Sequence, residues 1–353
     1  MRVLTIFGTR PEAIKMSVLC RKLNEDKYFD HKICTTGQHS EMVNSILSLF
    51  NIKPHYELNV MSSTLNVLCS NIFKEINKVY AEFNPDIVLV HGDTSSAAMS
   101  AIAAFHRGIK IGHVEAGLRT NNIYRPFPEE FNRTTIDKIS DYCFAPTVKN
   151  SESLLLEKVD AKKIIITGNT GIDALLEVDD NKFASDEIRE IYNGEKIVLV
   201  TGHRRENFGK GILDICNTIK KIANSYRVVY PVHLNPNIKD VVYRELSGLE
   251  NVTLTPPLDY ASFVYAMKRS YIILSDSGGI QEEAPCFGIP VLVMRSETER
   301  QEAVDCGVVE LVGTNPDYIM ERLEKVKRKN PTNLYGDGTS SQKIINFLKQ
   351  NAA

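Results

Sequence analysis

The stretch DIVLVHGDTSS, residues 86–96, joins a short apolar run to a glycine, an acid and small hydroxyl residues. The apolar first half is typical of a buried strand, and the polar second half is typical of a turn that leads into a helix. Similar runs recur along the chain and alternate with longer amphipathic segments. This alternation is typical of parallel sheets covered by helices on both faces, so the sequence predicts an α/β fold.

The predicted strands form two series. The first contains residues 3–7, 31–37, 86–93, 109–117, 141–146 and 163–169, and the second contains residues 196–202, 227–233, 251–256, 271–276, 290–294 and 308–313. A polar segment near residues 179–194 separates the two series, and 353 residues are about twice the length of a usual domain. We therefore expect two parallel-sheet domains, residues 1–178 and 179–339, with a cleft between them.

The composition excludes several classes of protein. With 42 basic and 44 acidic side chains the net charge is -2, which favours neither nucleic acid nor an anionic membrane as a partner. The seven cysteines include no CxxC pair, as expected for a reduced compartment, so we expect a cytoplasmic protein. No apolar run approaches the roughly 18 residues that a membrane helix needs.

The first candidate site follows the first predicted strand, in GTRPEAIK, residues 8–15. In parallel α/β sheets ligands bind beyond the carboxyl ends of the strands. Thr9 is a plausible N-cap, and Pro11 suits the first turn of a helix. Arg10 and Lys15 add positive charge there, which favours an anion site. The alternative is a well-capped helix with solvated basic residues.

A second candidate site lies in SDSGGIQEEA, residues 275–284. Ser277, Gly278 and Gly279 can bring backbone N–H groups close to a phosphate. Glu283, about one turn into the helix, is placed to bind the hydroxyls of a ribose. The pattern is neither a dinucleotide fingerprint nor a P-loop. The alternative is a tight turn between strand and helix with an incidental acid.

Three successive units place carboxylates at the same edge of the first sheet. Asp93 and Glu115 each follow a strand, and Glu129 and Glu130 begin the next helix. Gathered carboxylates are expected to raise the pKa of at least one of them, which suits general acid and base catalysis. The alternative is structural: N-capping by Asp93 and Glu129, and a buried salt bridge from Glu115 to Arg119.

Histidines occupy similar positions. His91 and His113 each precede an acid by two residues, a spacing that allows a metal site but equally suits hydrogen bonding in the core. His203 follows the first strand of the second series, where we expect it to contact ligand or carry a proton. His39 follows another strand end, and Arg300 in TERQEAV offers a further cation.

The chain contains, in this order, FGTRPEAIKM, VHGDT, GHVEAGLRT, PEEFNR, TGHRREN, PVHLNP, DSGGIQEEAP, PVLVMR and TER. The series resembles the non-hydrolysing UDP-N-acetylglucosamine 2-epimerases of bacteria over nearly the whole chain. The resemblance implies two Rossmann-like, doubly wound domains facing a deep cleft, as in GT-B glycosyltransferases, with the C-terminal helix at about 340–353 packed back on the first domain. It also implies a homodimer that uses no metal and no cofactor.

The resemblance further implies roles for individual residues. The nucleotide would be held by Arg10, Lys15, Ser277, Gly278, Gly279 and Arg300, with Glu283 on the ribose and Leu258 and Phe263 near the uracil. The sugar would be surrounded by Asp93, Glu115, Glu129 and His203. Some family members bind a second UDP-N-acetylglucosamine as an activator, and the residues here that would permit this are Gln38, His39, Arg204 and His233.

The implied reaction is reversible epimerisation of UDP-N-acetylglucosamine to UDP-N-acetylmannosamine, a precursor of surface polysaccharide. The carbon 2 proton is hardly acidic, so UDP would leave carbon 1 as that proton is removed, giving a 2-acetamidoglucal that is reprotonated on the opposite face as UDP returns. Three alternatives stay open at this stage: a retaining GT-B glycosyltransferase, a non-catalytic nucleotide-sugar sensor and a metal-dependent hydrolase.

Overall fold

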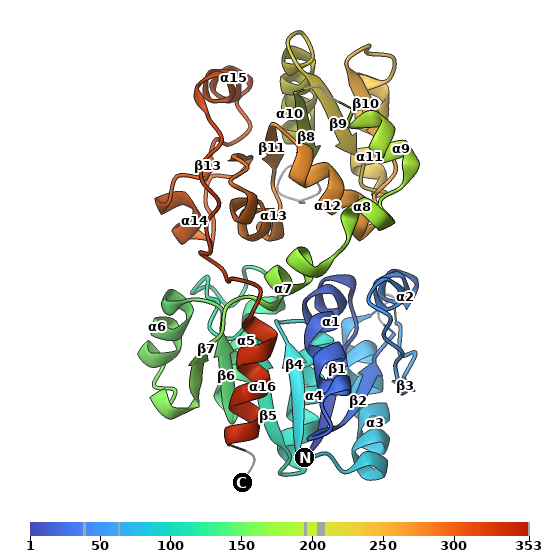
Figure 1. Ribbon diagram of the computed structural model, residues 1–353, viewed down its shortest axis with the longest axis vertical. Coiled ribbons are helices and arrows are strands. Elements are labelled where there is room, and N and C mark those ends of the chain that lie inside the picture. The colour runs from blue at the N-terminus through green and yellow to red at the C-terminus, as the bar shows by residue number, and fades with distance from the viewer. Residues whose placement is uncertain (38–39, 63, 194–195, 203–208, 352–353) are drawn as a thin grey trace. The chain divides into compact units, whose positions relative to one another are not determined.

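The computed structural model describes residues 1–353 except residues 38–39, 63, 194–195, 203–208 and 352–353 (Figure 1). The chain forms two compact units. Unit 1 comprises Met1–Glu177 and Tyr335–Ala353, and unit 2 comprises Val178–Leu334. The chain therefore leaves unit 1 once and returns to it near its end. No helix in the described part of the chain is both long enough and apolar enough to cross a membrane.

Unit 1 contains a seven-stranded parallel sheet in the order β3-β2-β1-β4-β5-β6-β7. Its strands are β1 Arg2–Phe7, β2 Asp30–Thr35, β3 Tyr56–Glu57, β4 Ile87–His91, β5 Lys110–Val114, β6 Tyr142–Ala145 and β7 Ile164–Ile166. Its helices are α1 Arg10–Glu25, α2 Ser40–Leu49, α3 Leu65–Phe83, α4 Ser95–His106, α5 Glu129–Ile139, α6 Val148–Leu156, α7 Thr170–Glu177 and α16 Ser340–Gln350, with a short 3-10 turn at Ala161–Lys163.

The strands of unit 1 are continuous apolar runs in the sequence because the core covers them on both faces. Central strands of a parallel sheet are covered on both faces, so side chains of either direction are buried. Every residue of β4 is buried, and Leu4, Ile6 and Val88 pack in one cluster with Tyr80 of α3. Among the strands in the described residues of unit 1, β3 alone was not predicted from the sequence; it is two residues long and lies at the sheet edge.

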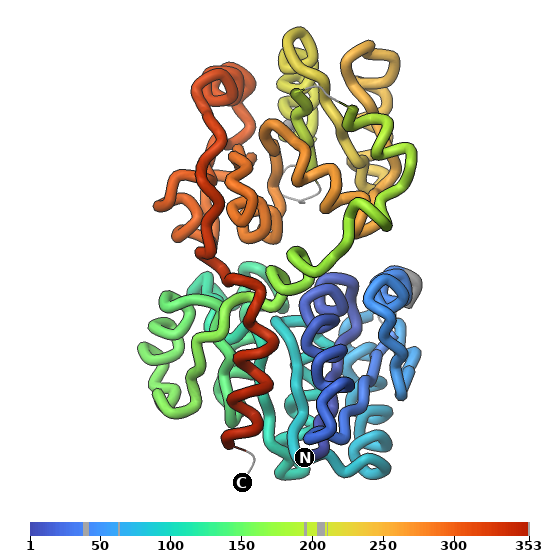
Figure 2. The backbone as a smooth tube through the Cα atoms, in the orientation of Figure 1, coloured from blue at the N-terminus to red at the C-terminus, as the bar shows by residue number. Residues whose placement is uncertain are grey.

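Helix α16 brings the end of the chain back to unit 1, where it packs against α1 and α7 (Figure 2). Its start is held by Asp173 of α7, whose carboxylate accepts hydrogen bonds from the backbone N–H groups of Ser340 at 3.1 Å and Ser341 at 2.6 Å. Further along, the ring of Phe347 meets the rings of Tyr142 and Phe144 edge-on. The buried Asp173 thus serves as a remote N-cap for the last helix.

Replacing Asp173 by Ala is expected to lower the free energy of unfolding by about 1–3 kcal/mol, because two backbone donors lose their acceptor in a buried place. Urea titration followed by circular dichroism measures this change. Asp337→Ala is the control, since the side chain of Asp337 is 46% exposed and partly hydrated. Equal stability of the Asp173→Ala variant and the wild type would contradict the capping role.

Unit 2 contains a six-stranded parallel sheet in the order β10-β9-β8-β11-β12-β13. Its strands are β8 Ile197–Thr201, β9 Arg227–Pro231, β10 Val252–Thr255, β11 Ile272–Ser275, β12 Val291–Val293 and β13 Val309–Leu311. Its helices are α8 Asp180–Phe183, α9 Asp186–Ile191, α10 Lys210–Ile222, α11 Pro236–Leu246, α12 Tyr260–Arg269, α13 Gly278–Glu283, α14 Gln301–Asp305 and α15 Pro316–Lys325, with a 3-10 turn at Ala284–Phe287.

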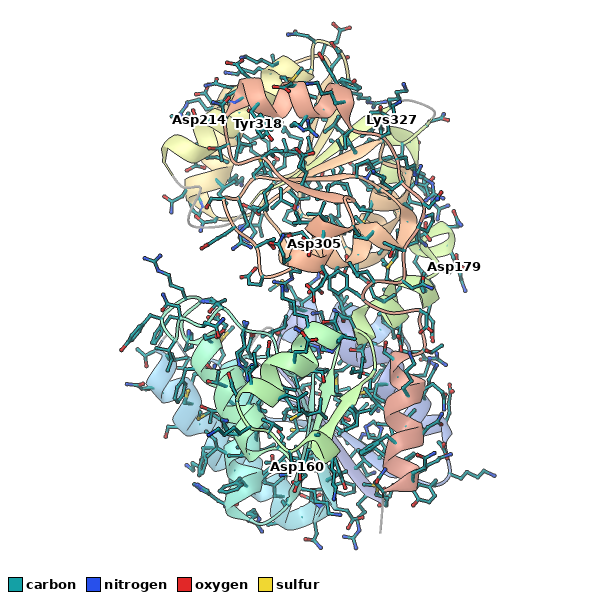
Figure 3. The ribbon with its side chains drawn as sticks, turned by 90° about the vertical axis from the view of Figure 1, so that its left-hand side faces the viewer. Asp160, Asp179, Asp214, Asp305, Tyr318 and Lys327 are labelled. Carbon is teal, nitrogen blue, oxygen red and sulfur yellow. The ribbon has the colours of Figure 1, made fainter. Side chains whose placement is uncertain are left out.

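Unit 2 begins with a short polar helix. Asp179, labelled in Figure 3, accepts a hydrogen bond from the backbone N–H of Lys182 and so caps α8. Asp180 then pairs with Lys268 at 2.6 Å and Arg269 at 2.9 Å, which fixes α8 to the end of α12. Each predicted strand is present, and the predicted α/β class with two Rossmann-like parallel sheets is confirmed.

Candidate functional site

The strand order of each sheet reverses at one place, and loops diverge there to leave room for a ligand. In unit 1 this switch point lies between β1 and β4, and in unit 2 it lies between β8 and β11. The segments that the sequence singled out follow these strands or their neighbours. Each unit therefore has its own set of candidate residues, in the loops and helix starts at the carboxyl edge of its sheet.

Glu12 connects the two sides of the switch point in unit 1. One carboxylate oxygen accepts hydrogen bonds from the backbone N–H groups of Gly8 at 3.0 Å and Thr9 at 2.8 Å, and from the Thr9 hydroxyl. The other accepts from the Thr94 hydroxyl at 2.6 Å. Burial raises the pKa of Glu12 despite these donors. Thr9 is the N-cap of α1, as predicted. Glu12 was not predicted as a site residue, although its capping-box spacing after Thr9 indicates its contact with the N-cap.

Glu115 lies just after β5 in a conformation that a residue with a side chain rarely adopts. Its φ is 70°, which for a non-glycine residue costs on the order of 1–3 kcal/mol and is common at functional sites. The backbone N–H groups of Glu115 and Ala116 both donate to the carbonyl of Phe144 at 3.1 Å, which holds this turn in place. The strained backbone presents the Glu115 carboxylate at the edge of the sheet.

Lys15 and His91 both contact the Glu115 carboxylate. The Lys15 ammonium donates to Oε2, and the Nε2 atom of His91 lies 3.2 Å from the same oxygen. Burial alone would raise the pKa of Glu115, but Lys15 and His91 outweigh it and lower that pKa well below its usual range. The sequence predicted a raised pKa for at least one of the gathered carboxylates. The pKa of Glu115 is lowered instead, because the ammonium of Lys15 contacts its carboxylate. The structure thus brings two predicted site residues, Lys15 and Glu115, into direct contact.

Asp93 lies in the turn between β4 and α4. Its carboxylate is paired with Arg133, and its carbonyl accepts a hydrogen bond from the Asn132 side chain at 2.8 Å. Asp93 is not the N-cap of α4, since Thr94 accepts from the backbone N–H of Ala97. Helix α5 therefore holds the Asp93 turn in place from the side.

Glu129 is the first residue of α5, and Pro128 occupies the N-cap position, so capping by Glu129 does not occur. Its Oε2 atom is buried and has no hydrogen-bond partner among the described residues. Glu130 instead accepts hydrogen bonds from the backbone N–H groups of Thr120 and Asn121, both at 3.0 Å. The Oε2 atom of Glu130 also has no hydrogen bond among the described residues, but it lies 3.4 Å from the guanidinium of Arg133, whereas Glu129 has no such ion pair among the described residues.

The predicted alternative of a salt bridge from Glu115 to Arg119 is wrong. Arg119 pairs with Asp137 at 2.7 Å and with Glu157 at 2.6 Å. His113 is fully buried and is hydrogen-bonded to the same Asp137. Neither Arg119 nor His113 therefore occupies the exposed edge of the site.

In unit 2 the glycine turn and Arg300 lie together. The backbone N–H of Ser277 donates to the hydroxyl of Ser275 at 2.9 Å, which fixes the turn at the end of β11. A methyl group added to Gly278 would lie 2.9 Å from the Cζ atom of Arg300, so only a glycine allows the guanidinium to pack this closely. The structure thus brings Ser277, Gly278, Gly279 and Arg300 together, and Glu283 ends the same short helix, α13.

Two acids hold Arg300 in this position. Its guanidinium contacts Glu282 at 2.8 Å and Glu299 at 3.2 Å. Glu299 also pairs with Arg295 at 3.1 Å. Burial opposes the ionisation of Glu299, but Arg300 and Arg295 outweigh it and lower the pKa of Glu299 to about 2.

This low pKa predicts that the free energy of unfolding of unit 2 decreases as the pH falls into the acid range. A carboxyl group with a depressed folded-state pKa stabilises the fold above its unfolded-state pKa, near 4.5, and that contribution is lost as the pH falls toward about 2. Glu299→Gln should remove about 2–3 kcal/mol of pH-dependent stability over this window. Urea titrations at a series of pH values measure it, with the exposed Glu321→Gln as control. If the free energy of unfolding of Glu299→Gln depended on pH as that of the wild type does, the lowered pKa of Glu299 would be contradicted.

The other predicted residues of unit 2 are placed as follows. Leu258 lies in the loop after β10, Phe263 lies on α12, and both are partly exposed. His233 follows β9, is exposed, and its Nδ1 atom accepts from the backbone N–H of Asn235 at 3.1 Å. The remaining predicted residues lie outside the described part of the chain: His203, Arg204, Gln38 and His39.

Comparison with known proteins gives one consistent result. A family model described as UDP-N-acetylglucosamine 2-epimerase matches residues 21–349. The UDP-N-acetylglucosamine 2-epimerase of Escherichia coli strain K12 is 46% identical over 372 residues, covering 99% of this chain and 99% of that protein.

Solved structures agree with this result. The crystal structure of UDP-GlcNAc 2-epimerase from Neisseria meningitidis bound to UDP-GlcNAc is similar, with a TM-score of 0.92 and 44% identity, covering 99% of this chain and 100% of that chain. The crystal structure of Methanocaldococcus jannaschii UDP-GlcNAc 2-epimerase in complex with UDP-GlcNAc and UDP is also similar, with a TM-score of 0.88 and 33% identity. The match covers 99% of this chain and 100% of that chain. Likeness of this extent in sequence and fold leaves one assignment: the chain belongs to the UDP-N-acetylglucosamine 2-epimerase family.

Proposed function

We propose that this protein interconverts UDP-N-acetylglucosamine and UDP-N-acetylmannosamine by inverting carbon 2 of the sugar. The observation that carries the proposal is the full-length similarity to proteins named for this activity, together with the bound UDP-GlcNAc in the similar Neisseria structure. Glu115 also supports the proposal, because its strained backbone and its ion pair with Lys15 place an ionised carboxylate near the switch point of unit 1.

The nucleotide is held in this proposal by backbone donors and cations. The N–H groups of Ser277, Gly278 and Gly279 and the guanidinium of Arg300 bind the pyrophosphate, with Arg10 and Lys15 as further cations. Glu283 accepts from the ribose hydroxyls, and Phe263 and the backbone of Leu258 contact the uracil. Donors fixed in advance stabilise the negative charge that develops on a leaving UDP, and each well-placed one typically contributes about 100- to 1000-fold in rate.

The sugar is surrounded by acids in this proposal: Asp93, Glu115 and Glu129, with His203 as a further proton carrier. The bond from carbon 1 to the phosphate oxygen breaks and UDP leaves with the electron pair, while a carboxylate removes the carbon 2 proton. The resulting 2-acetamidoglucal has a double bond between carbons 1 and 2. A second acid then delivers a proton to the opposite face of carbon 2 as UDP adds back to carbon 1, so all atoms are conserved.

Two features favour Glu115 and Glu129 for these proton transfers. Glu115 is ionised, because Lys15 and His91 outweigh the effect of burial and lower its pKa, and only a carboxylate without a proton can accept one. Glu129 has a buried oxygen with no partner among the described residues, so it is available to a hydroxyl or a proton of the sugar.

We also propose a homodimer. Exposed apolar side chains lie on three helices that pack side by side in unit 1: Leu65 and Val67 on α3, Phe105 on α4 and Phe131 on α5. Apolar surface of this kind often marks a protein interface. Sedimentation analysis should give twice the chain mass, and a monomer at micromolar concentration would contradict the proposal.

Biological context follows from the reaction. Its product would supply the synthesis of a surface polysaccharide, and the absence of a CxxC pair suits the cytoplasm. The activator site at Gln38, His39, Arg204 and His233 stays a prediction, because only His233 lies among the described residues.

The test of the proposed function is an assay of the purified chain with UDP-N-acetylglucosamine alone, followed by nuclear magnetic resonance of the sugar. The expected result is a mixture of the two epimers with almost no free UDP. Release of UDP would indicate a hydrolase, and UDP release only with an added sugar acceptor would indicate a glycosyltransferase. Binding without turnover would indicate a nucleotide-sugar sensor. Each of these three results would overturn the proposal.

A further inference from the structure

Beneath the acid-bearing turns of unit 1 lies a buried ionic cluster that the proposed reaction does not use directly. We name it the Asp137 cluster, after its central carboxylate, with His113 and Arg119 as the other two members. The side chains of His113 and Asp137 are 0% exposed and that of Arg119 is 4% exposed. Charged side chains are rarely buried this completely, because burial is costly unless each charge is paired.

The hydrogen-bond partners of His113 determine its charge. Its Nδ1 atom lies 2.6 Å from a carboxylate oxygen of Asp137, and its Nε2 atom lies 2.7 Å from the backbone carbonyl of Gly92. A carbonyl oxygen can only accept, so Nε2 must carry a proton. An ionised Asp137 can likewise only accept, and Nδ1 must then carry a proton as well.

The remaining partners of Asp137 favour its ionised form. Its second oxygen is paired with Arg119 at 2.7 Å and accepts from the backbone N–H of Gly117 at 3.3 Å. Burial opposes ionisation, but His113 and Arg119 outweigh it and lower the pKa of Asp137. A neutral Asp137 would leave the buried guanidinium with only the half-buried Glu157 as its anion, so the charged pair of imidazolium and carboxylate is the favoured state.

The other groups that face the cluster balance its charge. Glu157 pairs with Arg119 through two hydrogen bonds, at 2.6 Å and 2.9 Å. The thiol of Cys143 on β6 lies 3.8 Å from the Asp137 carbonyl, and burial raises its pKa, so it stays neutral. With His113 as an imidazolium, two cations, His113 and Arg119, face two anions, Asp137 and Glu157.

The same cluster holds both of the turns that carry the proposed catalytic acids. His113 binds the carbonyl of Gly92, the residue immediately before Asp93. Asp137 binds the N–H of Gly117, two residues after Glu115. One buried carboxylate thus links the two turns, directly on one side and through His113 on the other.

We propose that His113 is a positioning residue, held as an imidazolium, that together with Asp137 sets the spacing between the carboxylates of Asp93 and Glu115. This inference rests on the proposed function, because it assigns a role to that spacing. A displacement of about 1 Å at a reacting group can cost on the order of 100-fold in rate, so a group that fixes the spacing matters even without touching substrate.

His31 provides a matched control within the same sheet. It is also buried with both ring nitrogens bonded, Nδ1 to the Asn24 side-chain oxygen at 2.6 Å and Nε2 to the Thr5 hydroxyl at 2.9 Å. The hydroxyl can donate, so His31 is satisfied as a neutral ring, and burial lowers its pKa to about 3. His31 lies near the start of β2, at the opposite end of the strand from the site.

The charge is tested on the intact wild-type protein, labelled with ¹⁵N at histidine. At about pH 8, where a free imidazole has lost its second proton, His113 should show two protonated ring nitrogens and His31 only one. Assignment comes from the spectra of His113→Gln and His31→Gln. A neutral His113 ring at this pH would overturn the inference, whatever the activity of the protein.

The positioning role is tested by kinetics. His113→Gln should lower kcat by about 100-fold while KM for UDP-N-acetylglucosamine changes less than about threefold, and His31→Gln should leave both unchanged. Arg119→Lys, which keeps the charge but loosens the cluster, should lower kcat by about tenfold and provides a second variant if His113→Gln does not fold.

The outcomes separate this inference from the proposed function. An active wild type whose kcat is unaffected in Arg119→Lys, or falls no further in His113→Gln than in His31→Gln, would overturn the positioning role. An inactive wild type would instead refute the proposed function, and the spectra would still decide the charge of His113.

Discussion

Replacing Glu115 by Gln is expected to lower kcat by about 1000-fold while UDP still binds. Proton transfer by a positioned side chain contributes typically about 100- to 10,000-fold, and an amide cannot take up the carbon 2 proton. The substitution keeps the size of the side chain but removes the charge that pairs with Lys15 and His91. Because the proposed pyrophosphate donors lie mainly in unit 2, the affinity for UDP should change far less than kcat.

Steady-state kinetics and calorimetric titration with UDP measure the two quantities. Glu177→Gln is a matched control in the same unit, because Glu177 also pairs with a cation, Arg21, but is partly exposed and lies on α7. The control should keep the wild-type kcat. A Glu115→Gln variant with more than about a tenth of wild-type kcat would contradict the role of Glu115 as a proton-transfer group.

The second large effect is expected at Arg300. Replacing it by Gln should weaken UDP binding by at least about 100-fold, since truncating one partner of a buried charge pair costs roughly 2–5 kcal/mol. Two losses act together: the pyrophosphate loses a cation, and Glu282 and Glu299 each lose one cation partner, although Glu299 keeps Arg295. The less neutralised carboxylates would then repel the incoming diphosphate.

Calorimetry with UDP measures the affinity, and urea titration shows how much stability is lost with it. Arg322→Gln is the control, because its partner Glu310 is similarly close but both side chains are about 30% exposed. It should bind UDP as the wild type does. Wild-type affinity in Arg300→Gln would remove Arg300 from the nucleotide site.

The sequence was sufficient to predict the strands and the segments that follow them. Parallel strands buried on both faces appear as apolar runs, and loops at their carboxyl ends appear as glycine with polar residues, as in Gly92-Asp93 and Gly278-Gly279. β3 was not predictable, because two residues carry no periodic pattern.

Pairing between side chains was less predictable. Arg119 follows Glu115 closely in sequence, which suggested a salt bridge, yet the turn at Gly117 carries Arg119 to Asp137 on α5. The true partner of Glu115 is Lys15, which is 100 residues away and comes near only when β1 and β5 belong to the same sheet. Local spacing cannot reveal such a contact.

The pKa direction of Glu115 shows the same limit. The sequence suggested a raised pKa for at least one of the gathered acids without indicating which one; at Glu115 the ammonium of Lys15 contacts the carboxylate, and the pKa is lowered. His113 was recognised as a core or metal-binding candidate, but its link to Gly92 and Asp137 required the fold.

The most direct test of the account is to incubate the protein with UDP-N-acetylglucosamine in deuterated water and to examine carbon 2 of the recovered nucleotide sugars. The account predicts that deuterium enters at carbon 2 in both epimers while the total of UDP-linked sugar stays constant. Epimers that form with the original hydrogen still at carbon 2, or recovery of unlabelled substrate alone, would contradict it.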